Sequence, residues 1–243
     1  MTDHSDQLFR DPMRAPAPFR FDADVVRVFP DMIRRSVPGY ETVIAMTGLL
    51  GGRFARPGSR VYDLGCSLGA STLALCHHIP QDDVTIVAVD SSSAMIERCR
   101  ELLRIDGQEH RVELRGEDIR STPLSDASVV VLNYTLQFIA VEERRALLSR
   151  VAEAMQPGGV LILSEKVVFP DSTLNALNIE MHHDFKRAHG YSELEIAAKR
   201  DSLENVLVPE TLDTHRERLS DAGFRSCDVW FQCFNFASLI ALR

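Results

Sequence analysis

The sequence predicts an α/β protein with a doubly wound, mostly parallel seven-stranded sheet that has an antiparallel strand at the C-terminus. Three observations lead to this prediction. Short β-branched runs alternate with helical stretches from residue 60 onward, the first run ends in an acid and a glycine turn, and the last two runs are joined by a short turn alone. Because crossovers between parallel strands are right-handed, their carboxyl ends meet at one edge of the sheet, where ligands bind.

The expected strands are Arg60–Leu64, Val84–Val89, Arg111–Arg115, Ser128–Asn133, Val160–Ser164, Val229–Cys233 and Phe236–Leu242. The expected helices of the sheet domain are Leu68–His78, Ser93–Ile105, Glu142–Met155 and Pro209–Ala222. The last two strands form a hairpin, which turns the final strand antiparallel to its neighbours.

The chain divides into a flexible tail at 1–19, a helical lid region at 20–59 and the sheet domain at 60–243, which contains a helical insert at 171–206. In the lid region, Val25, Val26 and Phe29 recur at helical spacing, and we expect breaks at Pro30 and at Pro38-Gly39.

Composition excludes several classes of function. The chain is 45% hydrophobic and 26% charged, which is ordinary for a globular domain, and its net charge is −8. That charge argues against direct binding of nucleic acid, since lysine and arginine supply most of such affinity. The five scattered cysteines predict neither a disulfide framework nor a metal site. With no signal peptide and no membrane-spanning run in the sequence, we expect a cytoplasmic location.

The stretch "VYDLGCSLGAST" places Asp63 at the entrance of a turn that contains Gly65 and Gly69. A carboxylate about 4 Å from a phosphate oxygen would cost on the order of 4 kcal/mol, which disfavours NAD, FAD and ATP. A sulfonium nucleoside such as S-adenosylmethionine would instead be attracted. Cys66 is expected to fill space, and Ser67 is either a turn residue or a ligand contact.

Polar residues also follow the next strands of the predicted sheet. Asp90 suits the ribose hydroxyls, Asp118 could accept a hydrogen bond from the adenine amino group, and Ile119 could pack on the ring. Asn133 ends the fourth strand and points to the same crevice. Each residue alone is better explained as a helix cap or turn residue. Together, at successive strand ends, they favour a ligand site.

The insert contains a group of cationic side chains. Ser192 and Glu195 form a capping box, so a helix begins there and Arg200 lies two turns further on. These side chains could bind a carboxylate, although charged residues on such a helix are commonly solvated surface. The adjacent histidines lack the spacing of a helical metal pair, so no metal is expected. The candidate cations are His182, His183, Lys186, Arg187, His189, Lys199 and Arg200.

These motifs resemble the class I S-adenosylmethionine-dependent methyltransferase superfamily, whose fold is Rossmann-like. Within it the sequence closely resembles the carboxy-S-adenosylmethionine synthase family, from about Phe21 to Arg243. The most specific stretches are "VFPDMIRRSVPGY", "LNYTLQF", "HHDFKRAHGYSELEIAAKR" and "WFQCFNFASLIAL".

The resemblance implies that S-adenosylmethionine and prephenate are converted to carboxy-S-adenosylmethionine and phenylpyruvate. Prephenate loses carbon dioxide and its hydroxyl, a methyl proton of S-adenosylmethionine is removed, and the methyl carbon captures the carbon dioxide. A partner enzyme then uses the product for the 5-oxyacetyl modification of the tRNA wobble uridine. The resemblance also implies a homodimer.

The family's site residues carry over by position. Those implied to contact S-adenosylmethionine are Tyr40, Gly65, Cys66, Ser67, Asp90, Ser91, Asp118, Ile119 and Asn133. Arg200 would bind the carboxylate of the product or of prephenate, and Tyr40 would cover the methyl-bearing end and exclude water. These two are the candidate catalytic residues. Two alternatives stay open: an ordinary small-molecule methyltransferase, and a binding module without turnover.

Overall fold

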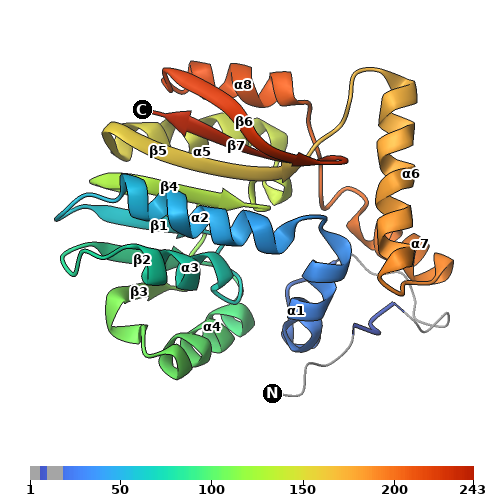
Figure 1. Cartoon of the computed structure of the whole chain (residues 1–243), viewed down its shortest axis with the longest axis horizontal. Helices are drawn as coiled ribbons and strands as arrows, with labels where there is room; N and C mark the ends of the chain where they lie inside the picture. The colour runs from blue at the N-terminus through green and yellow to red at the C-terminus, as the bar shows by residue number, and fades with distance from the viewer. Residues whose placement is uncertain (1–5, 10–18) are drawn as a thin grey trace.

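The computed structural model describes residues 6–9 and 19–243. Its centre is a seven-stranded sheet in the order β3-β2-β1-β4-β5-β7-β6 (Figure 1). The strand β7 pairs antiparallel with both of its neighbours, whereas β1 to β5 pair in parallel, so the predicted sheet is confirmed. The strands are β1 (Arg60–Leu64), β2 (Thr85–Val89), β3 (Val112–Arg115), β4 (Ala127–Asn133), β5 (Met155–Lys166), β6 (Ser226–Cys233) and β7 (Phe236–Leu242).

Helices cover both faces of the sheet because side chains alternate along each strand. Val61 and Val129 belong to the core under one face, packed with α2 and α3, while Tyr62 and Val130 belong to the core under α5 and α8. The helices are α1 (Ala23–Ser36), α2 (Tyr40–Phe54), α3 (Ala70–His78), α4 (Ser93–Asp106), α5 (Val141–Ala154), α6 (Ser172–Ala188), α7 (Glu193–Leu203) and α8 (Leu212–Asp221), with short 3-10 turns η1 (Glu109–Arg111) and η2 (Leu136–Phe138).

Three local predictions need correction. The expected break at Pro30 is wrong, because α1 continues through it to Ser36. Residues on both sides of Pro30, Val25 and Met32 among them, pack into the same apolar cluster, and this packing outweighs the lost hydrogen bond. The fifth strand is also longer than predicted, and α5 ends one residue earlier, at Ala154.

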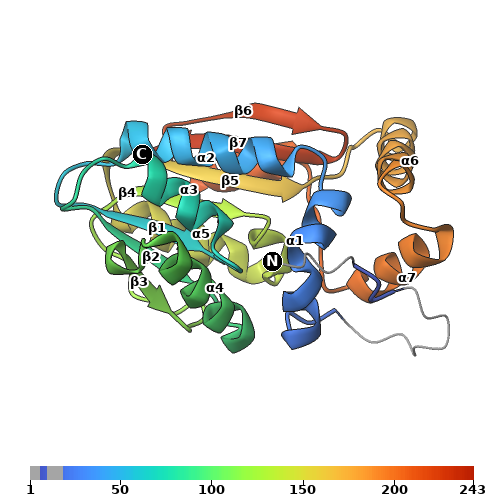
Figure 2. The ribbon, with the colours of Figure 1, turned by 60° about the horizontal axis from the view of Figure 1, so that its bottom comes forward.

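The N-terminal region packs against the insert. Most of the predicted tail at 1–19 lies outside the described residues, but Asp6 is buried and its N–H donates to Asp31 Oδ2 at 2.7 Å. Tyr191, which precedes α7, donates its hydroxyl to Asp6. Both α6 and α7 lie beyond the carboxyl ends of the parallel strands, next to α1 (Figure 2). None of the helices in the described ranges is long and apolar enough to cross a bilayer.

Candidate active site

A cavity of about 1520 Å³ opens at the carboxyl ends of the parallel strands. One side is formed by the ends of β1, β2 and β4 with the turns that follow them. The other side is formed by α1, the start of α2, the end of β5, and the insert helices α6 and α7. All ten residues that the sequence assigned to ligand binding line this one cavity: Tyr40, Gly65, Cys66, Ser67, Asp90, Ser91, Asp118, Ile119, Asn133 and Arg200.

The glycine turn after β1 is tightly packed. Gly65 has φ +86°, and a Cβ there would lie 2.3 Å from Thr135 Oγ1, so only glycine fits. Ser67 is also left-handed, with φ 50°, and its N–H donates to Asp90 Oδ2 at 2.9 Å. The turn therefore packs directly against Thr135, and both Gly65 and Thr135 line the cavity.

Asp90 follows β2 and lines the cavity with both carboxylate oxygens already engaged. Oδ2 accepts from Ser67, and Oδ1 accepts from the Ser92 N–H at 2.9 Å. Burial raises the pKa of this carboxyl, and the two backbone bonds work in the opposite direction. Each carboxylate oxygen has a further lone pair, so the group remains able to accept two ribose hydroxyls.

Asp63 does not line the cavity, contrary to the prediction from the stretch "VYDLGCSLGAST". Its side chain is buried beneath the turn, and Thr72 donates to Oδ2 at 2.6 Å. Burial raises its pKa to about 6, and the nearby charge of Asp90 adds to the rise. The negative charge facing the cavity on this side comes from Asp90 and Asp118 instead.

Asp118 and Ile119 follow β3. The Asp118 carboxylate is already paired within the fold, whereas Ile119 presents an apolar side chain. Arg120 binds both oxygens of Asp118 through Nε at 3.0 Å, and its Nη1 donates to Glu143 at 2.6 Å. The hydrogen bond from Arg120 lowers the pKa of Asp118. Ile119 is buried and offers a flat apolar contact at the cavity wall.

Asn133 ends β4 with its whole side-chain amide used inside the fold. Nδ2 donates to Thr47 Oγ1 at 3.1 Å and to Ser71 Oγ at 3.0 Å, and Oδ1 accepts from Ser164 Oγ at 2.7 Å. It therefore joins β4, β5, α2 and α3 at the cavity floor. Its amide hydrogens are not available to a ligand in this arrangement.

Aromatic and sulfur side chains cover the end of the cavity near the turn. The rings of Tyr40 and Tyr134 have centroids 6.1 Å apart, and Tyr134 also contacts Phe236 edge-on at 6.2 Å. Cys66 is buried, and the neighbouring Cys99 thiol together with burial raises its pKa, which favours the neutral thiol.

The structure places the predicted insert cations in different surroundings. His182, Lys186 and Lys199 are buried and line the cavity. Arg187 is exposed and pairs with Asp184 and Glu193, and it does not line the cavity. Arg200 lies at the mouth with its side chain 67% exposed and its Nη2 3.1 Å from Asp201.

Lys166, the last residue of β5, also lines the cavity, although it was not among the site residues predicted from the sequence. The same rule that selected Asp90 and Asn133, a polar residue at a strand's carboxyl end, would have selected it. Burial lowers the pKa of Lys166.

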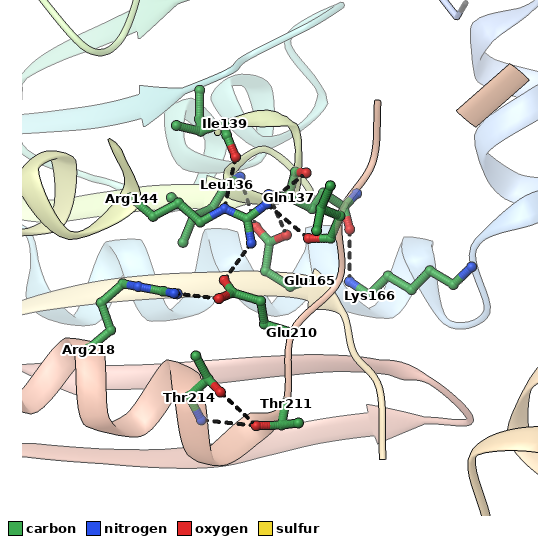
Figure 3. A network of polar contacts seen from close by, with 11 residues as sticks. Leu136, Gln137, Ile139, Arg144, Glu165, Lys166, Glu210, Thr211, Thr214 and Arg218 are labelled. Atoms are coloured by element: carbon green, nitrogen blue, oxygen red, sulfur yellow. Dashed lines mark hydrogen bonds and ion pairs between the residues drawn. The ribbon is translucent and has the colours of Figure 1, made fainter. Parts of the chain in front are cut away.

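A polar network fixes the loop between β4 and η2, which forms part of the cavity wall (Figure 3). Buried Glu165 accepts from the Leu136 and Gln137 N–H groups at 2.9 Å each, and burial raises its pKa to about 8. Arg144 donates to the carbonyls of Ile139 and Gln137 and pairs with Glu210. The Lys166 ammonium points away from these carboxylates.

Solved structures with a similar fold include methyltransferases. Residues 61–159 match the family model for a methyltransferase domain. An O-methyltransferase family protein from Burkholderia thailandensis superposes with a TM-score of 0.64 at 20% identity, over 95% of this chain and 65% of that one. Human N-acetylserotonin methyltransferase, solved with SAM, gives 0.59 at 16% identity, over 91% and 55%. These solved structures share the Rossmann-like fold of this chain, and the family match indicates a methyltransferase domain over residues 61–159.

Curated relatives narrow the assignment. A carboxy-S-adenosyl-L-methionine synthase from Marinobacter nauticus (strain ATCC 700491 / DSM 11845 / VT8) is 56% identical over 98% of this chain and 95% of its own length. One from Geobacter sp. (strain M21) is 54% identical over the full length of both. The chain belongs to the carboxy-S-adenosyl-L-methionine synthase family. Among the described residues, no group of three or more histidine, cysteine, aspartate or glutamate side chains could bind a metal ion.

Proposed function

We propose that this protein converts S-adenosylmethionine and prephenate to carboxy-S-adenosylmethionine and phenylpyruvate, and that a tRNA-modifying enzyme uses the product. The observation that carries the proposal is that one cavity joins Asp90 and Asp118 at the strand ends to Lys166, Lys186 and Lys199 on the other side. Its volume of about 1520 Å³ exceeds the roughly 300–1,000 Å³ of ordinary ligand pockets. There is room for two substrates side by side.

The strand-end side fits S-adenosylmethionine. Asp90 has lone pairs left for the ribose hydroxyls, and the turn at Gly65 lines the cavity where the amino-acid part would lie. Ile119 offers a surface for the adenine ring. Asp118 would accept from the adenine amino group while it stays paired with Arg120. When bound, S-adenosylmethionine supplies a sulfonium whose methyl group is the carbon to be carboxylated.

Tyr40 and Arg200 would act on the second half of the reaction. Tyr40 and Tyr134 place two rings over the cavity, which excludes water from the reacting carbon. The Arg200 side chain is largely exposed and pairs with Asp201, its one ion-pair partner among the described residues, so an incoming substrate carboxylate can compete for it. We assign water exclusion to Tyr40 and carboxylate binding to Arg200.

The test is to incubate the protein with both substrates and to identify nucleosides by mass spectrometry. We expect a nucleoside heavier than S-adenosylmethionine by one carboxyl group, together with phenylpyruvate, and neither product when one substrate is omitted. Recovery of unchanged S-adenosylmethionine alone would contradict the proposal. Formation of S-adenosylhomocysteine with a methylated acceptor would instead identify an ordinary methyltransferase.

The insert also supports the proposed homodimer. Leu174, Leu177 and Met181 lie on one face of α6, and their exposed fractions are 51%, 48% and 38%. A second copy that covers this face would remove apolar surface from water. Sedimentation should give a dimer, and Leu177→Asp should shift it toward the monomer. A parent chain that sediments as a monomer at micromolar concentration would contradict this assembly.

A further inference from the structure

The few lysines of this chain all line one cavity. Of its 27 basic residues, 24 are arginine and three are lysine: Lys166, Lys186 and Lys199. All three line the same cavity, although they come from the separate elements β5, α6 and α7. The rest of the molecule, including the exposed helix faces where lysine is common, uses arginine alone. This distribution sets the three lysines apart from ordinary surface charge.

Two of the three ammonium groups have no partner in the described part of the chain. The Lys166 ammonium points away from Glu165 and Glu210 (Figure 3), and only its backbone N–H forms a hydrogen bond, to Gln137 Oε1 at 3.0 Å. Lys186 is 7% exposed, and within residues 6–9 and 19–243 its ammonium has neither a hydrogen bond nor an ion pair. Lys186 is part of the cavity wall.

Lys199 differs because the fold supplies it with a partner. Its Nζ donates to Ser36 Oγ at 2.8 Å and lies 5.6 Å from the centre of the Tyr191 ring. Asp6 and Asp31 lie close enough to act on it electrostatically. We therefore place Lys199 at the side of the cluster, and Lys166 and Lys186 at its centre.

Such an arrangement is unfavourable without a ligand. Partial removal of an ammonium group from water costs free energy unless a partner compensates it, and like charges nearby increase the cost. Burial, together with the charges of Lys199 and Lys166, lowers the pKa of Lys186 to about 7. An anion with more than one negative charge would offset both the desolvation and the repulsion.

Aromatic rings lie beside the cluster. The His182 ring meets Phe236 edge-on with centroids 4.9 Å apart, and Phe236 in turn contacts Tyr134. Both Phe236 and Tyr134 line the cavity. This wall suits the apolar ring of a substrate that also carries carboxylates.

We propose that Lys166 and Lys186, with Lys199 beside them, form the anion subsite that binds a dicarboxylate co-substrate against the Phe236 wall. The identity of that dicarboxylate as prephenate rests on the proposed function. The lysines are assigned to substrate binding, and S-adenosylmethionine binds at the opposite side of the cavity.

Substitution tests the subsite directly. Lys166→Met and Lys186→Met keep the length and the apolar stem of the side chain and remove the charge. Loss of one charge-assisted contact predicts that the KM for prephenate rises at least about tenfold in each variant. The affinity for S-adenosylmethionine, measured by calorimetry, should stay within about twofold because the lysines do not touch that side. Arg216→Met, on the exposed face of α8, is the matched control and should leave both values unchanged.

A second measurement uses the unaltered chain, so it does not depend on how the variants fold. Because lysine occurs only at the three sites, an amine-acylating reagent followed by peptide mass spectrometry reports on the subsite, with an added lysine-containing peptide as internal reference. Saturating prephenate should slow the acylation of Lys166 and Lys186, while the reference peptide reacts at the same rate. Phenylpyruvate, with one carboxylate, should protect less. Equal labelling with and without prephenate would overturn the subsite.

The outcomes separate this inference from the proposed function. If both methionine variants make carboxylated product with the parent's KM for prephenate, the proposed function stands and the subsite is wrong. If the parent makes no such product but prephenate still protects the two lysines, the dicarboxylate subsite stands and the proposed reaction is wrong.

Discussion

The two sides of the cavity differ in whether their charged side chains have partners within the described part of the fold. At the strand ends, Asp90 accepts two backbone N–H groups and Asp118 is paired with Arg120, so each carboxylate has its partners within the fold. On the insert side, Lys166 and Lys186 have none within the described ranges. The first side is preorganised by the sheet and its turns. The second side gains its missing interactions only from a bound anion, so we expect it to govern the second substrate.

Removing the charge of Asp90 should have the largest effect on this comparison. In the parent, each Asp90 oxygen accepts a hydrogen bond from one backbone N–H. In Asp90→Asn, an NH₂ group replaces one of these oxygens and cannot accept that bond, and the charge-assisted bonds to the ribose are lost. With about 1.5–3 kcal/mol for such a bond, S-adenosylmethionine should bind about 100-fold more weakly by calorimetry. The exposed Asp82→Asn is the control and should bind like the parent. If Asp90→Asn binds S-adenosylmethionine with an affinity within about threefold of the parent, Asp90 does not bind the nucleoside.

Arg200 tests the opposite side with a smaller expected effect. In Arg200→Ala, product formation should fall at least about tenfold, while S-adenosylmethionine binding stays nearly unchanged, since one exposed charge-assisted contact is removed. Arg216→Ala removes a comparably placed surface arginine and should leave turnover as it is. Equal turnover by Arg200→Ala and the parent would remove Arg200 from the mechanism and leave the buried lysines as the carboxylate ligands.

The strand-end side was largely predictable because topology determines it. Any residue that follows a parallel strand comes to the same edge, so Gly65, Asp90 and Asp118 were placed together from the order of the strands alone. What the sequence could not show is how each side chain is used. Asp63 turns beneath α3 to meet Thr72, which depends on the depth of the turn and the packing of the helix above it.

The insert side was less predictable because its contacts join distant segments. The carbonyl of Ser36 lies 2.8 Å from His182 Nε2, and Lys199 meets the Ser36 hydroxyl at 2.8 Å. Contacts across more than a hundred residues decide which face of α6 and α7 is buried. Tertiary packing therefore decides that Lys199 is buried while the adjacent Arg200 is exposed, and no local sequence pattern shows this difference.

The smallest effect we expect is a pH dependence confined to the insert side. The groups that face Lys186 are Lys166 from β5, Lys199 from α7, and His182 and His183 from α6 itself. Burial, with the neighbouring lysine charges, lowers the pKa of Lys186 to about 7 and burial lowers that of Lys199 to about 8. Below these values both ammonium groups are charged, and above them the charge is lost.

Because a dicarboxylate binds the charged form, its affinity should fall as the pH rises through this range. We expect the KM for prephenate to increase about three- to tenfold from about pH 6.5 to about pH 8.5, with little change in the affinity for S-adenosylmethionine. In Lys186→Met the rise should be smaller, since one of the titrating groups is gone. A parent KM that is flat across this range would mean that the buried lysines do not meet the substrate in their charged form, and the contrast between the two sides of the cavity would lose its functional meaning.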